Sequence, residues 1–316
     1  MAGVAGDNTD RIIVVTRGDW PADRSEPRRG RLRPTNFIVV ADGNGNIVEQ
    51  WSQWDSILTL PHQAYISPYD PERHVWVVDS GGGNGHMQVL KFSNDGDELV
   101  MQLGEVDHPK TRGDARGRSD WGPHTYGWPS KLAFLPDGSS LLADGYWNSR
   151  IIKYTADGEF VMEWGALGNG PGEFDLLHGL AIDRDRRVYV GDRQNSRIQI
   201  FSEDGEFIEE WPDIFDPVNI WIDRDQWVWV LDASLNRALK YSREGELQYH
   251  WGAYGQADAI GRGTWAGGLS LPHQLDMDED GNLYIASNSG GWVDKFVPKP
   301  GADPSKLLGR RLLLTN

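Results

Sequence analysis

Hydrophobic and polar positions alternate along most of the chain in short runs, and polar turns separate these runs. Several turns contain Asp-Gly or Glu-Gly, as in "RIIKYTADGEFVMEWG" (150–165) and "RALKYSREGELQYHWG" (237–252). Alternation with a period of two predicts β-strands that bury one face, and glycine supplies the positive φ that a tight hairpin turn requires. Because no stretch of any length shows the 3.6-residue period of a helix, the pattern predicts an all-β fold.

The strands recur as a larger unit. Each unit has an apolar first strand, an Asp-x-Asp-Gly type of turn, a second strand rich in Val, Tyr and Trp, a turn like Asn-Ser-Arg, and two further strands. The second strands, which mostly end in Asp, lie at 74–80, 140–150, 188–197, 228–237 and 283–291, with a divergent first copy at 11–19. Six units of four strands predict a six-bladed β-propeller, whereas a β-sandwich has no reason to repeat such a unit. We expect residues 1–316 to form a single propeller domain, with 306–315 as a candidate strand that closes the ring.

Three histidines occupy the same position of the repeat. Aligned on the residue that ends the second strand, the first strands of units two to six begin at His62, Ser130, His178, Val218 and His273. Inner strands line the central channel, so histidines in alternate blades would stand about 120° apart around one axis. Three neutral imidazoles with an open fourth position are typical of a catalytic zinc site. A lone histidine before a strand is more often a turn residue, but the phasing favours a metal site at His62, His178 and His273.

The residues that follow the second strand reach the same face of an antiparallel blade. Arg193 follows Asp192, Arg17 holds the equivalent place in the first unit, and Tyr146 lies one residue beyond it in the third. Guanidinium groups bind carboxylates bidentately, and a tyrosine beside a metal loses its proton more easily and can act as a general base. The alternatives are that Arg193 pairs with a neighbouring carboxylate and that Tyr146 packs on a blade edge.

Two long connections between blades, 104–127 and 253–269, leave on this same face. Long glycine-rich loops commonly cover functional sites, so both are candidates for a lid. Their arginines and glycines are equally compatible with a solvated spacer.

Composition narrows the possible partners. The chain has 316 residues, of which 39% are hydrophobic, and a net charge of −16, which repels nucleic acid and anionic membrane surfaces. Cysteine is absent, so His, Asp and Glu are the plausible metal donors. Neither a signal-peptide pattern nor 18 consecutive apolar residues occur. We expect a cytoplasmic monomer, or a secreted one if a signal sequence precedes these residues.

These motifs resemble a known family. The repeat resembles NHL repeats, and the full set resembles the peptidyl-α-hydroxyglycine α-amidating lyases. The resemblance rests on the segments at 16–20, 60–66, 142–165, 170–183, 190–201 and 271–287. It implies a six-bladed propeller that holds zinc, or another divalent metal, on His62, His178 and His273. It also implies that Tyr146 is the catalytic tyrosine and that Arg17 and Arg193 are active-site arginines.

The resemblance further implies a reaction, which is cleavage of the N–C bond of a carboxyl-terminal α-hydroxyglycine to give an amide and glyoxylate. A structural calcium ion is not expected, because Gln274 stands where the family has an acidic ligand. The substrate would be a small molecule or a peptide C-terminus that carries a carboxylate. The alternatives are a related metal-dependent hydrolase or lyase that acts on another small carboxylated substrate, and a non-catalytic NHL-type binding propeller. Binding alone requires neither phased histidines nor an arginine pair, so the pattern favours the enzyme.

Overall fold

The computed structural model describes residues 3–19, 34–81, 86–105, 122–252, 268–288 and 291–301. Most of the two candidate lid connections, 106–121 and 253–267, lies outside these ranges, as does the candidate closing strand at 306–315. Within the described ranges, no helix is long and apolar enough to cross a lipid bilayer.

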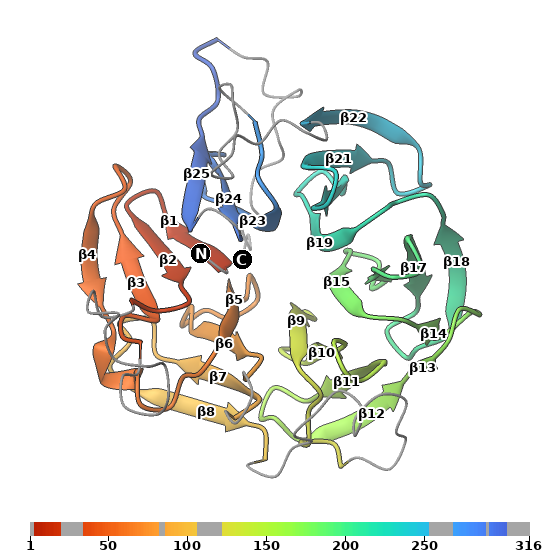
Figure 1. The fold of residues 1–316 in the computed structure, drawn as a ribbon, viewed down its shortest axis with the longest axis horizontal. Helices are drawn as coiled ribbons and strands as arrows, with labels where there is room; N and C mark the ends of the chain where they lie inside the picture. The colour runs from red at the N-terminus through yellow and green to blue at the C-terminus, as the bar shows by residue number, and fades with distance from the viewer. Residues whose placement is uncertain are drawn as a thin grey trace, which may run out of the picture.

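Six antiparallel sheets stand like blades around a central axis (Figure 1), which confirms the predicted six-bladed propeller. The inner strands are β1 (Gly3–Asn8), β5 (Pro61–Ile66), β9 (Pro129–Phe134), β15 (Leu177–Ile182), β19 (Pro217–Ile222) and β23 (Pro272–Met277). The second strands are β2 (Arg11–Val15), β6 (Val75–Asp79), β10 (Ser140–Asp144), β16 (Val188–Asp192), β20 (Val228–Asp232) and β24 (Leu283–Ser287). All six second strands lie within the segments that the sequence predicts.

The third strands are β3 (Ile38–Ala41), β7 (Gln88–Phe92), β11 (Arg150–Tyr154), β17 (Arg197–Phe201), β21 (Arg237–Tyr241) and β25 (Trp292–Phe296). The outer strands are β4 (Ile47–Gln50), β8 (Leu99–Leu103), β12 (Phe160–Trp164), β18 (Phe207–Trp211) and β22 (Leu247–Gly252), so the sixth blade has three strands in the described ranges. A short 3-10 helix, η1 (Ser52–Trp54), follows the first blade. A parallel pair, β13 (Ala166–Leu167) and β14 (Glu173–Phe174), lies in the link between the third and fourth blades.

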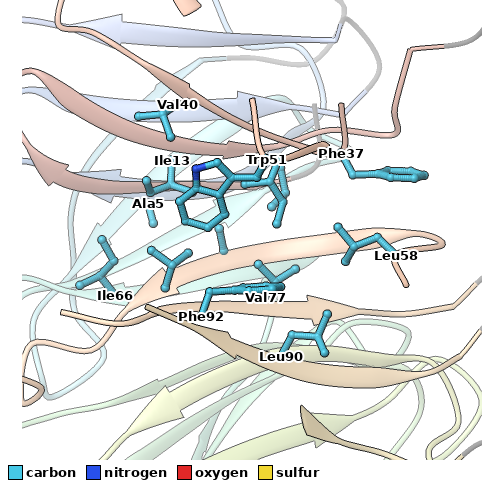
Figure 2. Close-up of a cluster of buried hydrophobic side chains, with 14 residues drawn as sticks. Ala5, Ile13, Phe37, Val40, Trp51, Leu58, Ile66, Val77, Leu90 and Phe92 are labelled. Atoms are coloured by element: carbon cyan, nitrogen blue, oxygen red, sulfur yellow. The ribbon is translucent and has the colours of Figure 1, made fainter. Parts of the chain in front are cut away.

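The core is divided among the interfaces between neighbouring blades. Every residue of β16 is buried, whereas the outer strand of the same blade, β18, exposes most of its side chains. Figure 2 shows one interface, where Ile13 and Val40 of the first blade face Val77 and Phe92 of the second. A corresponding cluster joins the sixth blade to the first, so β1 and β23 close the ring by packing.

A buried carboxylate ends four of the second strands. These are Asp79, Asp144, Asp192 and Asp232, each with no exposed surface. Each accepts backbone N–H groups from the segment that leads into the inner strand of its own blade. Asp79 binds the amides of Thr59 and Leu60 at 2.7 Å each, and Asp192 binds the amide of Asp175 at 2.8 Å. The carboxylate therefore fixes where the inner strand begins.

The same carboxylates bind the Arg that opens the third strand in three blades. The pairs are Asp144–Arg150 at 3.1 Å, Asp192–Arg197 at 2.9 Å and Asp232–Arg237 at 2.7 Å. In the second blade, Gln88 replaces the arginine and lies 3.4 Å from Asp79. Because an unpaired buried charge is strongly unfavourable, each carboxylate holds three strands of its blade in register at this end.

We expect Phe92→Ala to lower the free energy of unfolding by about 3–5 kcal/mol, because it leaves a cavity at a blade interface. The Phe92 ring is fully buried and lies 5.9 Å from the Trp51 ring, measured between centroids. Urea unfolding followed by tryptophan fluorescence measures the change. The matched control is Val100→Ala on β8, where the side chain is 46% exposed, and it should shift the free energy by less than about 0.5 kcal/mol. Equal effects of the two substitutions would contradict this account of the core.

Candidate metal centre

His62, His178 and His273 are the second residues of β5, β15 and β23, and all three are buried. In each strand the pairing with the second strand skips the histidine. Pro61 pairs with Asp79 and Gln63 with Val78, and the same shift occurs at the other two histidines. Such a β-bulge leaves one residue unpaired and redirects its side chain, and bulges are common beside active sites. The structure thus places the three predicted ligands together, each on a bulge opposite the residue that ends the second strand.

The three imidazoles converge on one point. Their ring centroids are 4.6–5.1 Å apart, and one potential ligand atom from each lies within 4.8 Å of the others. An ion at the centre would form Zn–N bonds of about 2.0–2.1 Å if each imidazole moved inward by less than about 1 Å. The spacing therefore fits a single metal ion.

Hydrogen bonds hold the imidazoles in the tautomer that a metal requires. Nδ1 of His62 lies 2.9 Å from the carbonyl oxygen of Ser130, and Nδ1 of His178 lies 2.6 Å from that of Val218. A carbonyl only accepts, so both Nδ1 atoms carry the proton and both Nε2 atoms present lone pairs. Nδ1 of His273 lies 3.1 Å from the side-chain amide of Gln63, and a half-turn of that amide presents its oxygen as the acceptor. The donor set fits a divalent metal such as zinc.

Burial also keeps the imidazoles of His62 and His178 neutral. Desolvation holds the pKa of His62 and of His178 well below the ordinary value, and the nearby positive groups act in the same direction. Neutral imidazole is the form that binds metal ions. These two side chains therefore do not have to lose a proton before a metal ion binds.

Tyr146 lies beside two of the three imidazoles. Its hydroxyl is 2.7 Å from Nε2 of His178 and 3.1 Å from Nε2 of His62. The preceding Gly145 allows this approach, because a Cβ there would lie 2.1 Å from the carbonyl oxygen of Leu177. Burial raises the pKa of Tyr146 to about 12, and Arg193 and Arg17 oppose the increase. The alternative that Tyr146 packs on a blade edge is therefore wrong.

Arg17 and Arg193 both lie close enough to Tyr146 to lower its pKa, but their surroundings differ. Arg193 forms a two-point ion pair with the buried carboxylate of Asp216, with Nη2 3.4 Å from Oδ2. The alternative that Arg193 pairs with a neighbouring carboxylate is therefore confirmed. Arg17 is partly buried and forms no ion pair with a carboxylate among the residues that the structure describes. Burial lowers the pKa of Arg17, and the nearby Tyr146 and Asp79 oppose this shift. The cation of Arg17 is thus the more available of the two.

Sequence reasoning missed Asp216 and an aromatic wall beside Tyr146. Asp216 lies in the link before β19, 23 residues from Arg193, with no motif to mark the pairing. Trp128 stacks on Trp147 with 4.9 Å between ring centroids and lies 5.7 Å from the Tyr146 ring. The sequence assigns most tryptophans to the core, but the position of Trp147 directly after Tyr146 in "GYWNS" is a usable signal.

The fold and the site define a six-bladed β-propeller with a candidate three-histidine metal centre at one end of its channel. A family model described as a 6-bladed β-propeller matches residues 135–244. Over 95% of this chain and 83% of the other, a solved structure of a streptogramin B lyase superposes with a TM-score of 0.57 at 14% identity. At that identity the likeness concerns the fold alone.

Curated relatives confirm the resemblance to amidating lyases as a distant one. Peptidylglycine alpha-amidating monooxygenase of Rattus norvegicus is 28% identical over 213 residues, which are 62% of this chain and 20% of that protein. Probable peptidyl-alpha-hydroxyglycine alpha-amidating lyase pgal-1 of Caenorhabditis elegans is 33% identical over 161 residues, 50% of this chain and 41% of that protein. NHL repeat-containing protein 3 of Mus musculus is 31% identical over 146 residues, 45% of this chain and 39% of that protein. Each match spans less than half of the relative's length.

We expect the purified protein to bind one divalent metal ion per chain, and His178→Ala to lower metal affinity at least tenfold, because it removes one of three ligands. Elemental analysis after equilibrium dialysis measures both. His250→Ala is the matched control, since His250 is exposed on the outer strand β22. Equal metal retention by His178→Ala and the wild type would rule out this site.

Proposed function

We propose that this protein is a zinc-dependent carbon–nitrogen lyase that cleaves an α-hydroxyglycine-type carbinolamide to an amide and glyoxylate. The observation that carries the proposal is the position of the Tyr146 hydroxyl, 2.7 and 3.1 Å from Nε2 of two histidines in a buried three-histidine group. The names of the distant relatives support the same chemistry.

The reaction breaks the bond between the amide nitrogen and the hydroxylated carbon. The bonding electrons leave with nitrogen, the carbinol C–O bond becomes the C=O bond of glyoxylate, and the hydroxyl proton is lost while nitrogen gains one. A zinc ion bound by the three imidazoles would act as a Lewis acid toward the substrate oxygen. Tyr146 is the group placed to accept the hydroxyl proton, and its return to nitrogen balances the reaction.

The base role requires the phenolate of Tyr146. A pKa of about 12 for Tyr146 would leave it protonated at neutral pH, and burial is the main cause. Arg193 and Arg17 favour the phenolate, and a divalent cation held by the adjacent imidazoles would lower the pKa of Tyr146 further. The base role therefore depends on the bound metal ion, because the pKa of about 12 already includes the effect of both arginines.

Arg17 is the residue best placed to bind the substrate carboxylate. A chain of net charge −16 repels anions at long range, so binding requires a local cation. Arg193 is already neutralised by Asp216, whereas Arg17 pairs with no carboxylate within the described part of the chain. We infer that Arg17 anchors the carboxylate and that Asp216 orients Arg193 toward Tyr146.

A non-catalytic binding propeller is the competing function, and the match to NHL repeat-containing protein 3 is compatible with it. Surface binding does not require three buried imidazoles around a tyrosine hydroxyl. A metal-dependent hydrolase or lyase for another small carboxylated substrate would use the same site.

The deciding experiment incubates zinc-loaded protein with α-hydroxyhippurate and measures glyoxylate and benzamide. Equimolar release that stops on chelation supports the proposal, and no release by a folded, metal-replete sample contradicts it.

Tyr146→Phe should reduce kcat for glyoxylate release by about 10²–10⁴-fold, the usual contribution of a general base. Metal content should stay at the wild-type value, because the three imidazoles are unchanged. Steady-state kinetics and elemental analysis on the same samples test both points. A Tyr146→Phe variant with undiminished kcat would remove the base role from this residue.

Arg17→Gln and Arg193→Gln should separate in their effects. We expect Arg17→Gln to lower kcat/KM roughly 30- to 1000-fold, equivalent to about 2–4 kcal/mol, with an unchanged free energy of unfolding. Arg193→Gln should lower both quantities, because it leaves the buried carboxylate of Asp216 unpaired. Adding Asp216→Asn to Arg193→Gln should restore stability but not activity. If Arg17→Gln destabilised the fold as much as Arg193→Gln, the assignment of Arg17 to the substrate would be wrong.

A further inference from the structure

A layer of buried polar side chains lies next to the three histidines on the inner strands. Gln63, Lys131, Asn219 and Gln274 each follow the repeat position that the histidines occupy, and each is at most 4% exposed. The amide of Gln274 is satisfied within the fold, since its oxygen accepts the N–H of Val4 at 2.9 Å and its nitrogen donates to a backbone carbonyl at 2.7 Å. Lys131 is the unusual member, because lysine is rarely buried without a partner of opposite charge.

Lys131 is 1% exposed. Its ammonium group donates to Oδ1 of Asn219 at 2.8 Å and to the carbonyl oxygen of His273 at 3.4 Å. The group has three N–H bonds, and both acceptors are neutral. No carboxylate pairs with Lys131 among the residues that the structure describes. A buried cation without a counter-ion is unfavourable, so the environment of Lys131 suits an anion that the described residues do not supply.

A cavity of about 150 Å³ adjoins Lys131 at the other end of the channel from the metal centre. On each inner strand that contributes to the cavity, the residues that line it come after the repeat position that the histidines occupy. Lys131, Asn219 and Gln274 come first along their strands and form the floor. The walls above the floor are mostly apolar, with Leu132, Leu180, Ile220 and Leu275 among them. They also include Asp276, whose carboxylate accepts the N–H of Gly6 at 2.7 Å.

The shape and polarity of this cavity define the ligand. A mostly apolar cavity of about 150 Å³ accommodates a molecule the size of benzene. A cation at the floor and apolar walls suit a ligand that enters with a charged end first and leaves an apolar body between the strands. We propose that the cavity binds a small aromatic or branched aliphatic carboxylate, about the size of benzoate, with its carboxylate on Lys131 and its apolar body against Leu180 and Leu275.

This proposal is independent of the proposed function. It uses no metal ligand side chain, and Arg17 and Tyr146 do not line this cavity. The competing possibility is that Lys131 is an uncharged amine, because burial lowers the pKa of its ammonium group well below the ordinary value. An uncharged amine needs no counter-ion, and binding of a neutral ligand would then equal that of the carboxylate.

The test titrates benzoate into the protein by isothermal calorimetry, with benzyl alcohol as the neutral probe of similar size. Benzoate could also bind Arg17, so the titration is carried out on Arg17→Gln as well as on the wild type. We expect one benzoate site that remains in Arg17→Gln and binds at least tenfold more tightly than benzyl alcohol. Lys131→Met should weaken that binding at least tenfold.

Lys131→Met also removes a contact with the backbone of His273. A second variant therefore tests the cavity without changing Lys131. Ile182→Trp fills the mouth of the cavity at the far end of β15, away from Lys131, and should weaken benzoate binding to the same degree. Thermal unfolding and metal content show whether each variant is folded. Three results would each overturn the proposal: no benzoate binding to Arg17→Gln, equal affinity for benzyl alcohol, or undiminished binding in folded Ile182→Trp.

Discussion

The buried carboxylate at the end of the second strand is the interaction on which the site depends. At Asp79 and Asp192 it binds the backbone amides that lead into the strands carrying His62 and His178. Burial raises the pKa of both carboxyl groups, and the N–H donors oppose that shift. Each of these hydrogen bonds therefore offsets part of the cost of burying the carboxylate. In the sixth blade, the hydroxyl of Ser287 takes this place and donates to the carbonyl of Ser270, three residues before His273.

Alternation around the ring explains the rest of the metal centre. Blades two, four and six supply imidazoles, and blades three and five supply the carbonyls of Ser130 and Val218 that orient two of them. A six-fold ring therefore yields a three-fold set of ligands from a single repeat position, and two of these ligands are supported from the blades between them. At this repeat position the third and fifth blades act through their backbone, whereas Tyr146 of the third blade reaches the site from the end of the second strand.

The sequence predicts the features that depend on short-range patterns, which are the second strands, the hairpin turns and the phase of His62, His178 and His273. It does not predict contacts between blades. The bulges arise from pairing between strands, and the Arg193–Asp216 ion pair joins the fourth blade to the link before the fifth. Within the described ranges no carboxylate pairs with Lys131, and this depends on which side chains surround it in the channel, which no spacing in the chain records. The period of the hydrophobic pattern and the residues of the turns carry no information about such long-range geometry.

The account rests on three imidazoles that share one metal ion, and X-ray absorption at the metal edge tests this most directly. Zinc-loaded protein in solution should show three imidazole nitrogens at about 2.0–2.1 Å, with the multiple-scattering pattern of coordinated histidine and one or two further light atoms. The His62→Ala variant should show one imidazole fewer or no bound zinc. A first shell of oxygen alone, or a wild-type spectrum with no imidazole scattering, would contradict the account.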